Sequence, residues 1–545
     1  MISPFRCFSH SRTSHVGTMV LALIALVIGS VTPAAYAQTY TVLYNLTVNS
    51  TDPFSPEWLG LFAQARDGNL YSTSQNGGAF GLGAIFQLTP AGALTVVHSF
   101  AGTDGSAPRG GLALGIDGSL YGTTYTGGSA NAGTVFKIST AGVYTVLHHF
   151  LNTTDGASPE APPIQGRDGN FYGTVTQANA TVGAVYKMTA AGVLTRLFVF
   201  DPAHGETPTA ITLGMDGNFY GTTRFGGANN DGTVFKITPA GKFTLLHSFN
   251  GTDGVDPIGP IIQASDGNFY GTTFQGKSIY KMTPAGVVTS LHTFGTGEAA
   301  QPSAGLIQAT DGNLYGAAVG GGAGAGTLFQ TTLTGIYTGL HNFNGADGWA
   351  PQVSMFQHTS GNFYGSTNAG GTSSKPGGVL YRLGMGLTSF VTFLPAQSPA
   401  KVGKTIGFLG QGFSGTTSVM FGTGSASFTI VSDTYMTAKV PASGTTGYVT
   451  VTTPSGTLMS SQTFKVLPVI TSFTPTSGPV GTKVTITGSG FIGATKVTFG
   501  GVKATSYTVD SGTQITATVP TGAKTGKIAV TTPGGTASKG TFTVS

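Results

Sequence analysis

Cysteine is almost absent from this sequence. The only cysteine, Cys7, lies in a segment that we expect to be removed from the mature protein. A chain with no second cysteine forms no internal disulfide, and the mature chain would hold no thiol. The sequence therefore excludes a disulfide-stapled fold and a catalytic cysteine.

Charge is also scarce, since Asp, Glu, Lys and Arg make up 8% of the 545 residues. Hydrophobic residues make up 39% and alternate with polar ones, which favours a turn-rich all-β protein over a disordered chain. The charge is uneven: residues 38–387 carry a net −5 and residues 388–545 a net +8. The Lys residues of the basic part are scattered over polar strand faces without an aromatic–basic cluster, so we predict a solvated surface and no nucleic-acid partner.

Long hydrophobic runs are missing after the first 37 residues. Arg6 and Arg12 precede the short apolar run 19–28, and Ala35-Tyr36-Ala37 is a small-x-small cleavage site. We expect residues 1–37 to be a signal peptide, with an uncleaved membrane anchor as the alternative. The mature protein is then secreted or held at the cell surface, with no membrane span.

A short acidic turn followed by Tyr recurs seven times. Its clearest copy runs from Asp216 to Thr223 and reads D-G-N-F-Y-G-T-T. Successive copies are 45 to 51 residues apart, and a period near 50 is typical of propeller blades or solenoids. The copies begin at Asp67, Asp117, Asp168, Asp216, Asp266, Asp311 and Ser360.

Each repeat contains four strand-like runs, called here A to D, separated by turn residues. Four antiparallel strands at this period describe a propeller blade. Residues 40–46 match strand D, yet no A, B or C strand precedes them, whereas the last unit supplies only A to C. We therefore predict that this segment completes the last blade and closes a seven-bladed β-propeller over residues 38–387.

These units resemble the GloVer-type (Gloeo_Verruco) tandem repeats of large bacterial exported proteins. The resemblance covers residues 40–385 and is carried by D-G-N-x-Y-G-T-T, a G-G loop, G-T-V-F-K-x-T-P-A-G and L-H-S-F. It implies an exported repeat protein and brings no reaction with it.

Two similar units follow, at residues 388–467 and 468–545. Alternating β-branched residues with Gly and Pro turns indicate two small β-sandwiches. The second unit has V-T-I-T-G-S-G-F at 484–491 and V-T-F-G-G at 497–501, and the first has related segments. Both units resemble IPT/TIG immunoglobulin-like domains, which implies spacers or contact modules.

Histidine recurs at one position of strand D, and aspartate at the hairpin turn. D strands lie on the outer rim of separate blades, so these histidines cannot converge on one ion, and each turn Asp stands alone beside Gly and Asn. We read both as structural positions and predict no metal and no cofactor. The histidines are His98, His148, His247, His292 and His341.

The remaining acidic residues of the repeats all fall in D-to-A or B-to-C connections, which strand alternation places on one face of the ring. The only two tryptophans also lie in D-to-A connections, before blades one and seven. Such a face could stack sugar rings and bind their hydroxyls, although polar loops and inter-blade Trp packing explain the same pattern. The predicted ligand-binding residues are Trp58, Trp349, Glu57, Asp347, Asp104 and Asp253.

No nucleophile elbow, zinc-protease motif or phosphate loop is present, and we assign no catalytic residue. We expect a non-catalytic binding or adhesion protein that contacts an extracellular polysaccharide or a protein through the propeller loop face. Two alternatives stay open: a carbohydrate-active hydrolase or lyase using loop carboxylates, and a structural component of the cell envelope.

Overall fold

The structure is a computed structural model that describes residues 38–48, 51–56, 61–177, 182–322 and 324–545. The predicted signal peptide lies outside the described residues. Gln38–Ser545 form one compact unit. The unit is built from strands, with one short 3-10 turn, η1 (Pro395–Gln397), so the all-β fold class predicted from the sequence is confirmed.

Within the described residues, seven four-stranded antiparallel sheets form the blades of the propeller. From strand A to strand D, they are β3 (Ala63–Gln64), β4 (Leu70–Ser74), β6 (Ala84–Leu88) and β7 (Leu94–Ser99) in blade 1; β8 (Ala113–Leu114), β9 (Leu120–Thr124), β10 (Thr134–Ile138) and β11 (Tyr144–His149) in blade 2; β12 (Ile164–Gln165), β13 (Phe171–Val175), β14 (Ala184–Met188) and β15 (Leu194–Val199) in blade 3; β16 (Glu206–Leu213), β17 (Phe219–Phe225), β18 (Thr233–Ile237) and β19 (Phe243–Ser248) in blade 4; β20 (Ile262–Gln263), β21 (Phe269–Thr273), β22 (Ser278–Met282) and β23 (Val288–Thr293) in blade 5; β25 (Ile307–Gln308), β26 (Leu314–Ala318), β28 (Thr327–Thr331) and β29 (Tyr337–Asn342) in blade 6; and β30 (Phe356–Gln357), β31 (Phe363–Ser366), β32 (Pro376–Gly384) and β1 (Thr39–Thr47) in blade 7. Two short pairs complete the propeller, β2 (Pro53–Phe54) with β5 (Asn76–Gly77) and β24 (Ala299–Ala300) with β27 (Gly320–Gly321).

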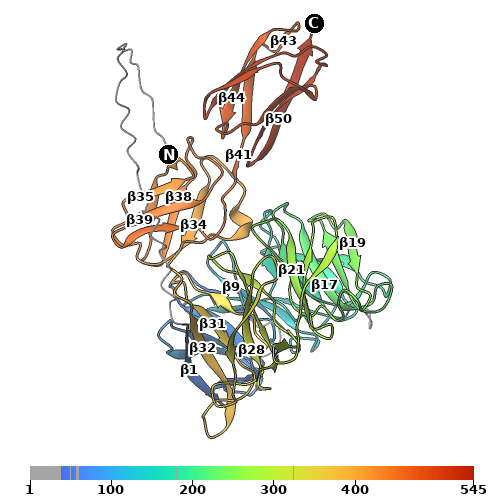
Figure 1. Ribbon diagram of the computed structural model, residues 1–545, viewed down its shortest axis with the longest axis vertical. Coiled ribbons are helices and arrows are strands. Elements are labelled where there is room, and N and C mark those ends of the chain that lie inside the picture. Colours follow the sequence, from blue (N-terminus) through green and yellow to red (C-terminus); the bar gives the residue numbers. More distant parts are fainter. Residues whose placement is uncertain (1–37, 49–50, 57–60, 178–181, 323) are drawn as a thin grey trace, which may run out of the picture. The chain divides into compact units, whose positions relative to one another are not determined.

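The N-terminal strand closes the ring. β1 pairs antiparallel with β32, so that Tyr40 lies opposite Leu383 and Val42 opposite Tyr381, and Figure 1 shows the two strands side by side. Leu46 of β1 is fully buried in a cluster that includes residues of blades 1 and 7. The predicted closure is therefore confirmed, and β32 is not left as an open edge.

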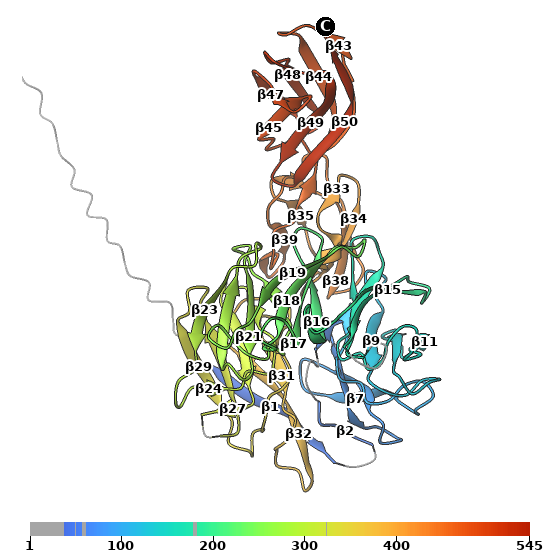
Figure 2. The same cartoon turned by 90° about the vertical axis from the view of Figure 1, so that its right-hand side faces the viewer.

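The repeated turn holds strands A and B of each blade together. In blade 4, whose four strands run side by side in Figure 2, the carboxylate of Asp216 accepts hydrogen bonds from the backbone N–H of Asn218 (3.0 Å) and the hydroxyl of Tyr220 (2.9 Å). Gly217 has φ +84°, which a residue with a Cβ adopts only at a cost. Lys236 of β18 adds a contact of 2.8 Å to the same carboxylate, so three strands meet at one side chain.

The F-Y pair at the start of strand B packs neighbouring blades together. Tyr172 stacks on Phe219 of the next blade with ring centroids 4.0 Å apart, and Tyr121 stacks on Phe171 at 4.1 Å. All four side chains are at most 3% exposed. Because stacked aromatic pairs stabilise beyond their buried area, one motif both closes the hairpin and joins the blades.

The A strands surround the centre of the ring. A cavity of about 340 Å³ is lined by residues of β8, β12, β16, β20 and β25, which come from five consecutive blades. The A–B and C–D turns form one side of the ring, called here the hairpin side. The D-to-A and B-to-C connections form the other, the loop side, where they are joined by bridges such as Ser106 to Thr126.

Two β-sandwiches follow the propeller. The first contains β34 (Thr405–Leu409), β38 (Tyr435–Lys439) and β37 (Phe428–Ile430) in one sheet, β36 (Gly424–Ser425), β35 (Ser418–Phe421), β39 (Val449–Thr453) and β40 (Gly456–Met459) in the other, and the pair β33 (Ala400–Lys401) and β41 (Val466–Leu467). The second contains β42 (Val469–Thr474), β44 (Lys483–Ser489), β48 (Gln514–Thr518) and β47 (Tyr507–Ser511) facing β43 (Ser477–Gly478), β50 (Gly535–Val544), β49 (Gly526–Thr532), β45 (Lys496–Phe499) and β46 (Val502–Lys503).

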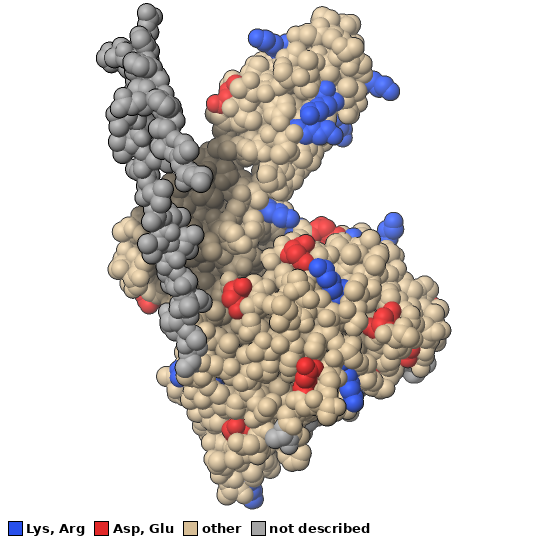
Figure 3. All heavy atoms as spheres, viewed as in Figure 1, with Lys and Arg blue, Asp and Glu red and all other residues tan. Residues whose placement is uncertain are grey.

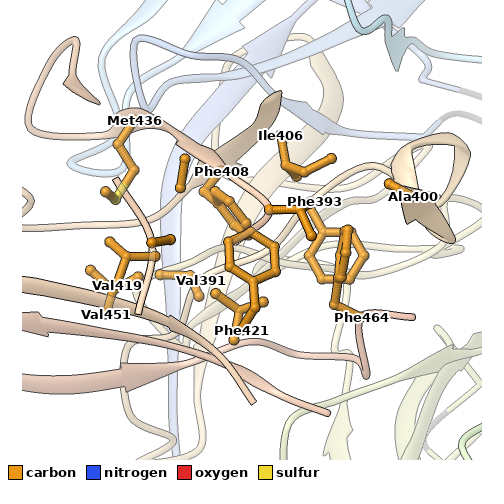
Figure 4. Packing of buried hydrophobic residues seen from close by; sticks show 14 of the residues in the cluster. Val391, Phe393, Ala400, Ile406, Phe408, Val419, Phe421, Met436, Val451 and Phe464 are labelled. Atoms are coloured by element: carbon orange, nitrogen blue, oxygen red, sulfur yellow. The ribbon is translucent and has the colours of Figure 1, made fainter. Parts of the chain in front are cut away.

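The core of the first sandwich is aromatic. Phe393, Phe408, Phe421 and Phe464 meet edge to face in Figure 4, with centroids 4.9 to 6.0 Å apart. Phe393 precedes the first sheet strand of this domain, so the segment before η1 belongs to the sandwich core and not to an eighth D strand of the propeller.

The degenerate seventh turn of the propeller contacts the first sandwich. Thr359 accepts a hydrogen bond from Gln411 (2.9 Å) and donates one to the Gly410 carbonyl (3.2 Å). The adjacent His358 is fully buried and contacts the Gly68 carbonyl at 2.9 Å. A covered turn has no need of a solvated Asp, which explains why Ser360 replaces it.

Candidate functional site

Three of the predicted ligand-binding carboxylates are occupied by other residues of their own loops. Asp104 lies 2.9 Å from His98 Nε2 and accepts a hydrogen bond from the backbone N–H of Ala101 (2.8 Å). Asp253 and Asp347 repeat this arrangement with His247 (2.9 Å) and His341 (3.1 Å). These carboxylates fix the start of each D-to-A loop, and their role as ligand contacts stays a prediction.

The strand-D histidines are inter-blade contacts. His98 stacks on Tyr144 of the next blade with centroids 3.9 Å apart, and His341 stacks on Tyr40 at 3.8 Å. Among the described residues, no group of three His, Cys, Asp or Glu side chains is placed to hold a metal ion. The histidines therefore do not converge, as their places on separate blades require.

Of the predicted aromatic pair, one member can be placed. Trp349 is 53% exposed on the loop side, where its backbone exchanges hydrogen bonds with Ala369 (2.7 and 3.1 Å). Trp58 and Glu57 lie outside the described residues. An exposed indole on this side leaves a flat apolar surface available for a ligand.

A strained backbone position recurs at the end of every D-to-A loop. In each copy the residue before a proline has φ between +51° and +58°, although pre-proline residues normally adopt extended backbone. In blade 2 this residue is Ala107, whose N–H donates to the Leu82 carbonyl of blade 1 (2.8 Å). The seven residues are Ser55, Ala107, Ser158, Thr207, Asp256, Gln301 and Ala350.

The residue after each of these prolines begins the inner strand, and two of them form an ion pair. Arg109 of blade 2 lies 3.4 Å from Glu160 of blade 3, with side chains 22% and 17% exposed. The guanidinium of Arg109 also lies over the ring of Tyr125, 3.7 Å from its centroid. Neighbouring blades thus bring a cation, an anion and an aromatic ring together at the loop-side end of the inner strands.

A second ion pair continues this arrangement. Arg224 of blade 4 binds Asp256 of blade 5 through two hydrogen bonds of 3.0 and 3.1 Å, and the Asp256 side chain is 1% exposed. We call Arg109, Glu160, Arg224 and Asp256 the charged row, because they alternate in sign over four consecutive blades.

Glu160 is the most perturbed member of the charged row. Burial raises the pKa of its carboxyl, and Arg109 and Arg224 both act to lower it. Because Arg224 acts on Glu160 as well as on Asp256, the two ion pairs form one electrostatic unit. A partly buried carboxyl between two guanidinium groups can accept hydrogen bonds or transfer a proton.

Some polar atoms at these repeat positions have no hydrogen-bond partner within the protein. Arg109 Nε and Ser303 Oγ are buried and unpaired, and both residues follow one of the loop prolines. Gln75 Oε1 is also buried and unpaired, at the position that Tyr125 occupies in the next repeat. Unpaired buried polar atoms are costly unless a ligand or water pairs them.

The charged row was missed in the sequence because its members lie in four different repeats and share no motif. One signal could have found it. The residue after the loop proline varies from repeat to repeat, whereas the proline itself is invariant. In chain order the variable residues are Glu57, Arg109, Glu160, Thr209, Ile258, Ser303 and Gln352.

Family comparison decides the kind of repeat. The family model described as "Gloeobacter/Verrucomicrobia repeat" matches residues 27–215, 164–278 and 277–419, which together span more than half of the chain. The chain belongs to the Gloeobacter/Verrucomicrobia repeat family. The IPT/TIG domain model matches residues 389–466 and 468–544 of this Gloeobacter/Verrucomicrobia repeat protein, so both C-terminal sandwiches are IPT/TIG domains.

No curated protein matches the chain. Solved structures share the propeller fold at low identity. A streptogramin B lyase is 17% identical with a TM-score of 0.46, covering 64% of this chain and 97% of its own. A virginiamycin B lyase from Staphylococcus aureus with quinupristin is 16% identical with a TM-score of 0.45, covering 64% and 99%. A putative gluconolactonase is 11% identical with a TM-score of 0.37, covering 65% and 94%.

Proposed function

We propose that this protein is an exported, non-catalytic binding protein whose propeller takes a glycan at the loop side, over the charged row. The observation that supports this most is the alternation of Arg109, Glu160, Arg224 and Asp256, with the Nε of Arg109 buried and unpaired. The same positions in blades 6 and 7 hold Ser303 and Gln352, so the propeller fold does not require these charges.

The chemistry of the charged row suits a ligand rich in hydroxyl groups. Guanidinium groups donate and carboxylates accept, so each ion pair can bind adjacent sugar hydroxyls without burying a net charge. The exposed indole of Trp349 on the same side supplies a surface on which a sugar ring can stack. The binding role also agrees with the repeats and the two IPT/TIG domains.

The test is a glycan array probed with residues 38–545 and two matched double variants. Arg109→Gln/Glu160→Gln removes both partners of the ion pair at similar volume, which avoids leaving one charge buried and unpaired. We expect it to lose glycan binding at least about tenfold, a change of about 1.4 kcal/mol. His98→Gln/Asp104→Asn removes a loop-side pair that anchors a loop, and we expect it to retain binding.

Unfolding midpoints of the two variants are measured alongside the array. Full glycan binding by a folded Arg109→Gln/Glu160→Gln variant would contradict the proposal. A loss of binding in the His98→Gln/Asp104→Asn control, with its fold intact, would move the site from the charged row to the rim of the loop side.

The raised pKa of Glu160 favours one second candidate, a carbohydrate hydrolase or lyase in which this residue is the general acid. The two candidates differ in the behaviour of Glu160→Gln. An enzyme with this variant would still bind the glycan but release no product from it, whereas the binding protein releases none even with its natural sequence. Product release from the array's tightest-bound oligosaccharide, measured by mass spectrometry, separates them.

A further inference from the structure

The second sandwich presents a sheet face that plays no part in the propeller site. In the sheet β43-β50-β49-β45-β46, Val497, Phe499, Ile528 and Val530 point into the core and are fully buried. Side chains alternate along a strand, so the residues between them point outward. On β45 and β49 the outward positions include Lys496 and its neighbours on the same face.

Strand register gathers three lysines around Thr498. Lys503 of β46 lies directly opposite Thr498, and Lys496 is two residues before it on the same strand. Ala529 of β49 lies opposite Thr498 on the other side, and Lys527 is two residues before Ala529. Directly opposed Cβ atoms lie about 5 Å apart and diagonal neighbours about 7–8 Å apart, so three ammonium groups share one small area.

The surroundings of these lysines make the face strongly basic. Lys496, Lys503 and Lys527 are exposed, and so is Lys524, whose backbone abuts Gly500 at the same end of the sheet. The described strands of this sheet contain no Asp or Glu, and Asp510, the only acidic residue of 468–545, lies on β47 of the opposite sheet. Blue side chains outnumber red ones on the visible face of this domain in Figure 3.

The first sandwich shows that its fold does not need these charges. Ser418 lies opposite Thr452 as Lys496 lies opposite Thr531, and Ser425 lies opposite Met420 as Lys503 lies opposite Thr498.

The backbone hydrogen bond from Gly422 to Tyr448 (3.1 Å) matches the one from Gly500 to Lys527 (3.0 Å). The same scaffold therefore carries Ser418, Ser425 and Tyr448 in one copy and three lysines in the other.

We propose that the Lys496–Lys503–Lys527 face binds an acidic polysaccharide. Three closely spaced ammonium groups are complementary to the regular carboxylate or sulfate groups of such a chain. Thr531 and Thr536 stand on the same sheet with their hydroxyls 3.0 Å apart and can bind sugar hydroxyls.

Other polyanions fit this face less well. Both phenylalanines in the strands of this sheet, Phe499 and Phe542, are fully buried, so no aromatic ring of these strands is available to stack a nucleobase. The outward positions among the lysines are Thr498 and Ala529, which offer no large apolar side chain to enter a lipid surface. An extended chain rich in both hydroxyls and anions remains the partner of matching chemistry.

Binding of residues 38–545 to two immobilised probes, heparin and polygalacturonate, tests the proposal. The first probe carries sulfate and the second only carboxylate, so together they report which anion the face prefers. We expect binding to weaken as salt rises, and the triple variant Lys496→Gln/Lys503→Gln/Lys527→Gln to bind the preferred probe at least about tenfold more weakly.

The matched control is Lys401→Gln/Lys404→Gln/Lys439→Gln, which removes the same charge from exposed lysines of the first sandwich. We expect this control to keep its affinity. Equal losses in both triple variants would show attraction by net charge alone and overturn the proposal, as would unchanged binding in the first variant.

Two further probes decide the class of partner. Tighter binding to duplex DNA, or to vesicles containing phosphatidylserine, than to either polysaccharide would also overturn the proposal. The propeller variant Arg109→Gln/Glu160→Gln should leave heparin and polygalacturonate binding unchanged, so a failure of this proposal is distinguishable from a failure of the glycan site on the propeller.

Discussion

At the scale of the residue, the turn aspartates carry most of the local order of the propeller. Each accepts a backbone N–H two residues on and a Tyr hydroxyl four residues on, as Asp168 does from Asn170 and Tyr172. In three blades a strand-C lysine joins them, with Lys187 at 2.9 Å from Asp168. One carboxylate thereby links the turn to strands B and C of its blade.

These contacts predict acid sensitivity. Burial acts to raise the pKa of Asp168, Asp216 and Asp266, but hydrogen bonds from the Asn, Lys and Tyr partners outweigh it and lower each pKa to about 2, below the usual 3.8. A lowered folded-state pKa gives stability that is present above pH 3.8 and is lost as the pH falls through about 2. The unfolding midpoint of residues 38–545 should therefore fall steeply below about pH 4.

The triple variant Asp168→Asn/Asp216→Asn/Asp266→Asn isolates this effect. Its unfolding midpoint should be about a few degrees lower at pH 7 and should fall less between pH 4 and pH 2, because these carboxylates no longer titrate. Calorimetric scans across this pH range measure both. A variant whose midpoint falls as steeply as that of the natural sequence would show that the turn carboxylates do not set the acid limit.

The sequence predicted the turn residues better than the site residues, for a physical reason. A turn is local, so Asp216, Gly217 and Tyr220 stand next to one another in every repeat and reveal their role by spacing. Arg109 and Glu160 meet only because the ring brings two repeats together. The carboxylates of Asp104 and Asp253 looked available in the sequence because their histidine partners lie across a loop from them.

At the scale of the element, β1 determines whether the propeller is a ring. It forms the outer strand of blade 7 although it is the first strand of the chain, and it pairs along its length with β32. The repeat period predicted this closure, since a D strand without its A to C partners needs a blade that lacks one. Its inward side chains join cores on both sides of the junction.

Leu46→Ala tests this role of β1. Leu46 is fully buried, so its truncation should lower the free energy of unfolding by about 2–5 kcal/mol. The matched control is Val48→Ala, two residues on and 39% exposed, which should change it by less than about 0.5 kcal/mol. Denaturant titration of both variants gives the comparison, and equal small effects would mean that β1 contributes little to ring stability.

At the scale of the whole molecule, charge is divided between the parts. The propeller is net negative and gathers its alternating charges at the loop side, whereas residues 388–545 are net positive and place three lysines on one sheet of the second sandwich. Together these features describe a protein with two separate polar surfaces, one on a closed ring and one on an IPT/TIG domain. Each surface is built on a scaffold whose other copies lack it.

The measurement that tests the central proposal most directly is a crystal structure of residues 38–545 soaked with the oligosaccharide that the glycan array shows to bind most tightly. We predict that the sugar lies at the loop side, with a hydroxyl accepting the unpaired Nε–H of Arg109 and another donating to Glu160. Sugar density elsewhere, with the charged row contacting only protein and water, would contradict the assignment of this row as the ligand site.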